Sequence, residues 1–89
     1  METRKDDVSV SDDIETLSRE FEEFKLQKEA AEAQVKNLRN AEDPKNGVFY
    51  AQEIFHLQQD KLRLDTEMEI RRRRMNRLRM AEADNGFLF

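Results

Sequence analysis

One segment, AEDPKNG at residues 41–47, limits the folds open to this chain more than any other stretch. Pro44 has no N–H to donate to a helical hydrogen bond, and it restricts the backbone of Asp43. Asn46-Gly47 is a dipeptide typical of turns. Asp43 as an N-cap, with Pro44 at the first helical position, would also suit the start of a new helix. We therefore expect two helices separated by a turn.

Apolar residues recur with a heptad period on both sides of this break, which predicts one long helix in each half. Ser9 or Ser11 would cap the first helix, and Asn85-Gly86 would end the second. The expected organisation is a polar N-terminal tail at 1–10, a helical hairpin at 11–84 (helix 11–41, turn 42–47, helix 48–84) and an apolar C-terminal tail at 85–89.

A short break between two long helices favours an antiparallel arrangement. The expected fold class is all-α, an antiparallel two-helix coiled-coil hairpin that oligomerisation or partner helices could complete. Eight a/d layers keep one register when Leu38 is set opposite Ile54, and five of them are apolar throughout. The layers pair Leu38 with Ile54, Val35 with Leu57, Ala31 with Lys61, Lys28 with Leu64, Phe24 with Met68, Phe21 with Arg71, Leu17 with Met75 and Ile14 with Leu78.

Charge is distributed unevenly along the chain, whose formal net charge is −4. Residues 1–24 carry nine acidic and three basic residues, whereas residues 70–80, IRRRRMNRLRM, carry six arginines and no acid. The antiparallel register would bring these two stretches together, so that opposite charges favour this orientation over a parallel one. The expected neighbours are Glu20 with Arg72, Glu15 with Arg77 and Asp13 with Arg79.

The arginine stretch admits three interpretations that the sequence leaves open. The arginines could pair internally with the acids of the first helix, or they could contact an acidic protein surface, such as the outside of a microtubule. The Arg71–Arg79 cluster could also bind a polyanion, either nucleic acid or anionic lipid. The net acidic charge and the lack of a following zipper disfavour nucleic acid. Neither the packing seam nor the acids account for Arg73 and Arg74.

The second helix also carries apolar residues outside the a/d seam, which indicates a second contact surface. Val48, Phe55, Leu62 and, displaced, Ile70 form this stripe. The tail at 87–89 is apolar and could fill a groove on a partner. The residues expected to contact a partner are Phe55, Leu62, Ile70, Arg72, Arg73, Arg74, Phe87, Leu88 and Phe89.

The chain offers little that suggests catalysis, a cofactor or a metal site. It has no cysteine, and it lacks a glycine-rich phosphate loop and a zinc signature. His56 has Glu53 and Asp60 on its side of the helix, but such surface clusters are common without a metal. No signal-peptide pattern and no membrane-spanning apolar run are present. We expect a non-enzymatic, intracellular chain, cytoplasmic or cytoskeletal, without a cofactor.

The segments REFEEFKLQKEAAE at 19–32 and NLRNAEDPKNG at 37–47, followed by a second long helix, loosely resemble the antiparallel coiled-coil fingers of Rho-GTPase effectors. The shared features are the length and a charged first helix before a turn. Such fingers usually place a glycine late in the first helix, where this chain has Ala30 or Ala31. The resemblance implies binding to a Rho-type GTPase.

The function that these features favour is a coiled-coil structural or adaptor element that mediates protein–protein assembly. It could be a small subunit of a larger cytoskeletal or scaffold complex. A Rho-type GTPase-binding finger and polyanion binding are the alternatives. A homodimer or tetramer is a further arrangement that the sequence allows.

Overall fold

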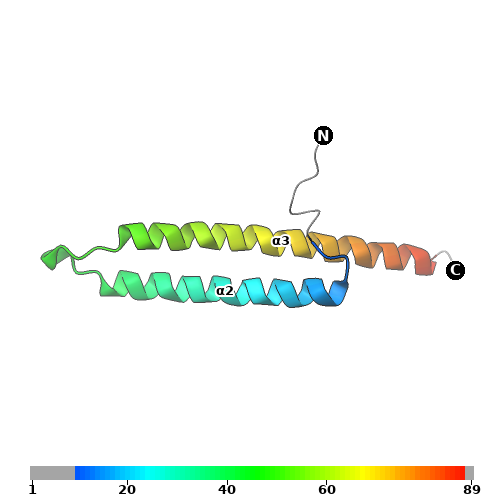
Figure 1. The fold of residues 1–89 in the computed structure, drawn as a ribbon, viewed down its shortest axis with the longest axis horizontal. Helices are drawn as coiled ribbons and strands as arrows, with labels where there is room; N and C mark the ends of the chain where they lie inside the picture. Colours follow the sequence, from blue (N-terminus) through cyan, green and yellow to red (C-terminus); the bar gives the residue numbers. More distant parts are fainter. Residues whose placement is uncertain (1–9, 88–89) are drawn as a thin grey trace, which may run out of the picture.

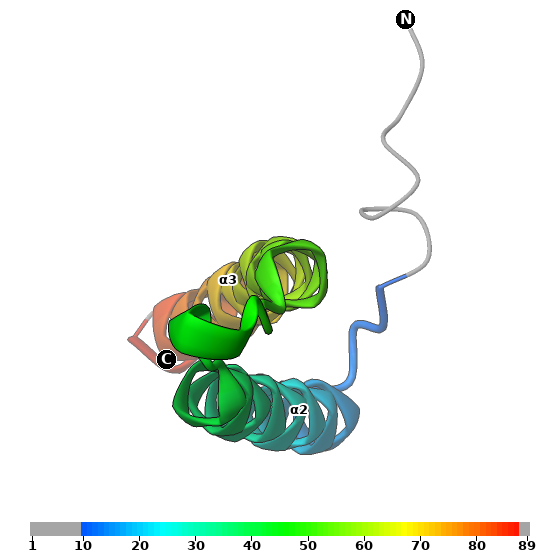
Figure 2. The ribbon, with the colours of Figure 1, turned by 90° about the vertical axis from the view of Figure 1, so that its left-hand side faces the viewer.

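The computed structural model describes residues 10–87, with side chains described for 10–82, and shows two long helices side by side (Figure 1). Helix α2 spans Ile14–Ala41, the short 3-10 helix η1 spans Pro44–Asn46, and α3 spans Ala51–Phe87. The hairpin is elongated, with extents of 70 × 29 × 15 Å. Seen from the turn, α2 and α3 form two layers of one helix each (Figure 2). The prediction of an all-α, antiparallel two-helix hairpin is confirmed.

Helix α2 begins at Ile14 because Asp13 caps it. Asp13 Oδ2 accepts hydrogen bonds from the Thr16 N–H at 3.2 Å and from the Thr16 hydroxyl at 2.6 Å, and these bonds lower the pKa of Asp13. A charged cap is favourable at a helix N-terminus. Ser11 instead accepts the N–H of Asp13 at 2.9 Å. The predicted start at residue 11 was therefore three residues too early.

The turn between the helices is a small loop closed by its own hydrogen bonds. Asp43 and Val48 form an isolated β-bridge, in which each N–H donates to the other carbonyl at 2.9 Å. Pro44 begins η1 inside this loop, and Gly47 follows with a φ of 70°, a left-handed conformation that glycine adopts without steric cost. The side-chain amide of Asn46 donates to Asp43 Oδ2 at 2.6 Å. The proline and the Asn46-Gly47 pair thus mark the reversal of the chain.

Helix α3 starts at Ala51, later than the predicted residue 48, because the turn continues through Tyr50. The Tyr50 N–H donates to Glu42 Oε2 at 3.0 Å, and the Tyr50 carbonyl accepts the N–H of Ile54 at 2.9 Å. A carboxylate at the end of α2 therefore satisfies an N–H that would otherwise lack a partner at the start of α3. The predicted cap at Asp43 begins only the short η1.

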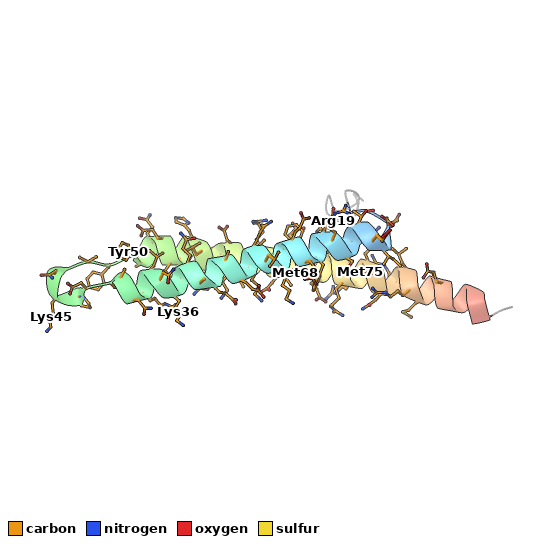
Figure 3. All side chains as sticks on the ribbon, turned by 90° about the horizontal axis from the view of Figure 1, so that it is seen from below. Arg19, Lys36, Lys45, Tyr50, Met68 and Met75 are labelled. Atoms are coloured by element: carbon orange, nitrogen blue, oxygen red, sulfur yellow. The ribbon has the colours of Figure 1, made fainter. Side chains whose placement is uncertain are left out.

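Helix α3 is the longer helix and projects past the start of α2 (Figures 1 and 3). The predicted stop at Asn85-Gly86 was wrong, since α3 continues to Phe87. Glycine costs a helix only about 1 kcal/mol relative to alanine, which does not force an end at that position. Of the predicted contact residues, Leu88 and Phe89 lie outside the described residues, as does the side chain of Phe87.

The main apolar cluster lies at the open end of the hairpin, far from the turn. Leu17 is fully buried, and Met75 is 7% exposed, as expected for the layer that pairs these two residues. Val10 joins them at 6% exposed, although it falls in the predicted polar tail at 1–10. An apolar residue that precedes a helix cap can fold back onto the helix, which the tail assignment overlooked. The residues that pack against this cluster are Phe21, Ile70 and Leu78.

Candidate functional site

Two of the predicted contact residues are exposed apolar side chains on α3. Phe55 is 57% exposed and Leu62 is 60% exposed. They are seven residues apart, so they lie on the same side of the helix. The ring of Phe55 meets the ring of His56 edge-on, with 5.8 Å between the centroids. Because α2 covers neither side chain, this pair is the best candidate for a contact surface.

Ile70, the displaced fourth member of the predicted stripe, belongs to the fold of the hairpin itself. Its side chain is half-buried and packs against the cluster of Val10, Leu17 and Met75. Residues 10–13 pass from the start of α2 towards α3 (Figure 1), and they bring Val10 to this position. The heptad pattern describes only the two helices and does not place residues 10–13. It therefore gave Ile70 no neighbour within the hairpin.

Within residues 10–82, three further large apolar side chains are exposed, and they were not among the predicted contact residues. Leu26 is 64% exposed, Phe49 is 61% exposed and Met80 is 65% exposed. Leu26 and Met80 occupy the f position of the heptad, which points away from the partner helix. The heptad pattern therefore already indicated that both side chains are exposed. Phe49 lies in the turn, just before α3.

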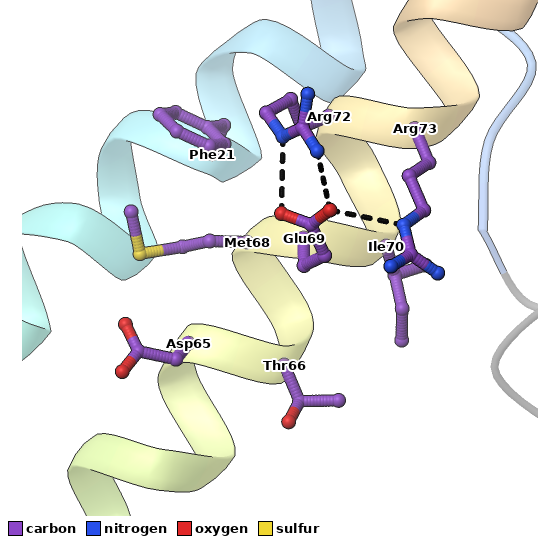
Figure 4. Close-up of a pocket in the computed structure, with 8 residues that line it drawn as sticks. All are labelled: Phe21, Asp65, Thr66, Met68, Glu69, Ile70, Arg72 and Arg73. Atoms are coloured by element: carbon purple, nitrogen blue, oxygen red, sulfur yellow. Dashed lines mark hydrogen bonds and ion pairs between the residues drawn. The ribbon is translucent and has the colours of Figure 1, made fainter.

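Glu69 holds two of the arginines that were predicted to attract a partner. Its Oε1 accepts from Arg72 Nε at 3.0 Å, and its Oε2 accepts from Arg73 Nε at 2.9 Å and also from Arg72 Nη2 (Figure 4). Hydrogen bonds from Arg72 and then from Arg73 lower the pKa of Glu69 to about 2, and Glu69 raises the pKa of Arg72. These pairs lie within one helix, whereas the predicted partner of Arg72 was Glu20 on the other helix.

Arg71 links the two helices towards the open end of the hairpin, and its side chain is only 12% exposed. Its Nε donates to Glu20 Oε1 of α2 at 3.2 Å, and its Nη1 pairs with the carboxylate of Glu67. The guanidinium lies 4.8 Å from the centroid of the Phe24 ring, which permits a cation–π interaction. The predicted layer set Arg71 against Phe21. The guanidinium instead reaches the next aromatic residue along α2.

Arg74 pairs with Asp12, so the fold uses a residue that was predicted to attract a partner. The Arg74 side chain is 14% exposed, whereas that of Arg73 is 69% exposed. Asp12 precedes α2, and this ion pair therefore holds the segment before α2 against α3. Of Arg72, Arg73 and Arg74, the first two remain accessible at the surface and the third does not.

The lysines at a positions make the ion pairs nearer the turn. Lys28 Nζ lies 2.7 Å from Asp65 Oδ1, and Lys61 Nζ lies 3.4 Å from Glu32 Oε2. The hydrogen bond to Asp65 raises the pKa of Lys28. Each lysine thus reaches a carboxylate of the opposite helix at the edge of the seam, as long side chains with charged ends do at such positions.

An open groove runs beside Glu69 where α2 crosses α3 (Figure 4). Phe21 of α2 lines it together with Met68 and Ile70 of α3 as apolar residues, and the Arg72–Glu69–Arg73 network contributes polar groups. The residues that line the groove are Phe21, Asp65, Thr66, Met68, Glu69, Ile70, Arg72 and Arg73. The sequence placed Arg72 and Arg73 together as neighbours, but it did not indicate the groove.

Other kinds of site receive no support within the described part of the chain. His56 with Glu53 and Asp60 does not form a metal site there, since no three His, Cys, Asp or Glu side chains of residues 10–82 are grouped to hold an ion. Neither α2 nor α3, as described, has an apolar stretch that could cross a bilayer. Comparisons of the chain with protein-family models, with curated proteins and with solved structures give no match.

Proposed function

We propose that this chain is a non-enzymatic coiled-coil adaptor that assembles with other helices through the side of α3 that carries Phe55 and Leu62. The observation behind the proposal is the exposure of these two side chains, 57% and 60%, on a rigid helix. Burying a large apolar side chain contributes about 1.5–3 kcal/mol, so two on one helical face favour association. A cytoplasmic scaffold or cytoskeletal complex is the setting we expect for such an adaptor.

The arginine network supports the proposal in a second way. Exposed Arg72 and Arg73 lie on the same helix as the apolar pair and would meet an acidic partner surface first, which raises association rates. Their joint partner Glu69 reduces this attraction, so we assign them to steering and assign the affinity to Phe55 and Leu62.

The test is Leu62→Glu compared with Leu26→Glu. Both changes place a carboxylate where an exposed leucine stood. Only Leu62 lies on the same side of α3 as Phe55, because Leu26 belongs to α2. We expect Leu62→Glu to abolish capture of partner proteins in a crosslinking pull-down, while its helix content by circular dichroism stays that of the wild type. A loss of helix content in Leu62→Glu alone would assign the side chain to the fold and contradict the proposal.

Polyanion binding is the second candidate, and the exposed side chains of Arg77 and Arg79 favour it. It predicts binding to nucleic acid or anionic vesicles that weakens steeply as salt rises. No binding at low salt would remove it. The GTPase-binding alternative rests on the resemblance alone.

A further inference from the structure

One side of α3 carries no charge from Ala51 to Thr66, in a chain of which 40% is charged. At 100° per residue, seven residues of this segment fall within an arc of about 120°. The five charged residues of the same segment all lie outside that arc. We call it the uncharged face, and its members are Ala51, Gln52, Phe55, Gln58, Gln59, Leu62 and Thr66.

The uncharged face is accessible and suited to contact. Its two large apolar side chains, Phe55 and Leu62, are exposed and lie at its centre. The Thr66 hydroxyl donates to the Leu62 carbonyl at 3.1 Å, which satisfies that hydroxyl within the helix and leaves the methyl group for packing. Leu26 is exposed as well, but charged residues surround it on the helix. Its neighbours one turn away include Glu22, Glu23 and Glu29.

We propose that the uncharged face binds the same face of a second copy, in antiparallel orientation, to form a four-helix dimer. The proposal rests on the proposed function and specifies its partner. With the twofold axis between Gln58 and Gln59, Phe55 of each copy lies opposite Leu62 of the other. Such an isologous contact needs a surface that complements itself. Neutral glutamine amides meet this need, because each both donates and accepts hydrogen bonds.

Charge supports this pairing, because no like charges meet across the face. At this register Asp65 lies opposite Gln52 of the second copy, and Thr66 lies opposite Ala51. A partner with a charged helix would instead set its charges against apolar side chains and neutral amides, which would remove water from those charges without pairing them. The chemistry that best matches the face is therefore the face itself.

Sedimentation equilibrium of the 89-residue chain tests the dimer. The wild type should have twice the 10.7 kDa mass of one chain. Leu62→Glu places a carboxylate in two symmetric contacts and should raise the dissociation constant at least about 100-fold. Leu26→Glu is the control, and it should remain dimeric. A dimer that Leu62→Glu leaves intact would overturn the proposal.

A mixing experiment tests the orientation. Phe55→Lys and Leu62→Glu should each be monomeric alone. When mixed, they should recover a heterodimer, because the antiparallel register sets the new lysine opposite the new glutamate. A parallel register would set the new lysine opposite Phe55 and the new glutamate opposite Leu62. A mixture that stays monomeric would contradict the antiparallel pairing.

The two proposals fail in different ways. A wild-type chain that sediments as a single 10.7 kDa species at high concentration would overturn the dimer. In that case, Leu62-dependent capture of another protein would still support the adaptor function. If neither a dimer nor Leu62-dependent capture is found, both proposals are wrong.

Discussion

The open end and the turn end of the hairpin are held together differently. At the open end, Leu17, Met75 and Val10 form a buried cluster, and Arg71, with a side chain only 12% exposed, joins the helices through Glu20. Towards the turn, the buried residues are Ala31, Val35 and Leu64, and two lysine–carboxylate pairs lie at the edges. The outer side of α3 at this second end is the uncharged face. Three buried residues are named at each end, but the fully buried one, Leu17, lies at the open end, whereas Phe55 and Leu62 lie exposed on α3 towards the turn.

Replacement of one leucine at each end should give the largest change in the free energy of unfolding. It tests directly whether the open end is the better packed of the two. Leu17→Ala should lower the free energy of unfolding by about 2–5 kcal/mol, because the side chain is fully buried within a cluster. Leu64→Ala makes the same chemical change at the turn end and should cost less. Urea unfolding followed by circular dichroism measures both values. An equal or larger cost at Leu64 would show that the turn end is packed at least as well as the open end.

Arg71→Ala should have the next largest effect. It leaves Glu20 and Glu67 without their cation and removes the guanidinium from the Phe24 ring, so the free energy of unfolding should fall by about 1.5–3 kcal/mol. Arg71→Lys retains the charge but not the planar fork, and we expect it to fall between the wild type and the alanine variant. The same unfolding measurement decides the order. A lysine variant as stable as the wild type would show that charge alone matters.

Protonation of Glu69 should give the smallest change in stability, and only in a narrow range of acid pH. Its pKa is lowered from 4.5 to about 2, so the contribution of its arginine pairs is present above about pH 4.5 and is lost as the pH falls towards about 2. The carboxylate is partly exposed, so the change should be modest. Comparison of Glu69→Gln with the wild type from pH 5 to pH 2 tests this expectation. Identical pH curves for the two proteins would contradict it.

The heptad pattern predicted the helices and the layer of Leu17 with Met75, because packing along a helix follows a simple period. The short break between the helices predicted their antiparallel arrangement. The heptad pattern did not predict features that depend on local hydrogen bonds and local contacts. The choice of Asp13 over Ser11 as a cap depends on which side chain reaches the Thr16 N–H. Ile70 packs against a cluster that includes Val10, whose position no periodicity encodes.

The prediction of the acidic partners of the arginines was wrong for a related reason. The predicted partner of Arg72 was Glu20 on the other helix, and no partner was predicted for Arg73, but Glu69 reaches both from three and four residues away along α3. Local pairs of this spacing are neighbours on every helix, and they form without any tertiary contact. The apolar surface was predicted better, since Phe55 and Leu62 are exposed as expected. Its uncharged surroundings become visible only when the residues are placed around the helix.

The pairing of Glu69 with two arginines also bears on competition between ligands. A carboxylate tethered to the same helix acts on Arg72 and Arg73 at a high effective concentration, at least in the millimolar range that short connections give. A dissolved anion must exceed that level, or offer several charges at once, before it displaces Glu69. At Arg72 and Arg73 we therefore expect small anions to compete poorly with Glu69, and an extended acidic surface, which offers several charges at once, to compete better.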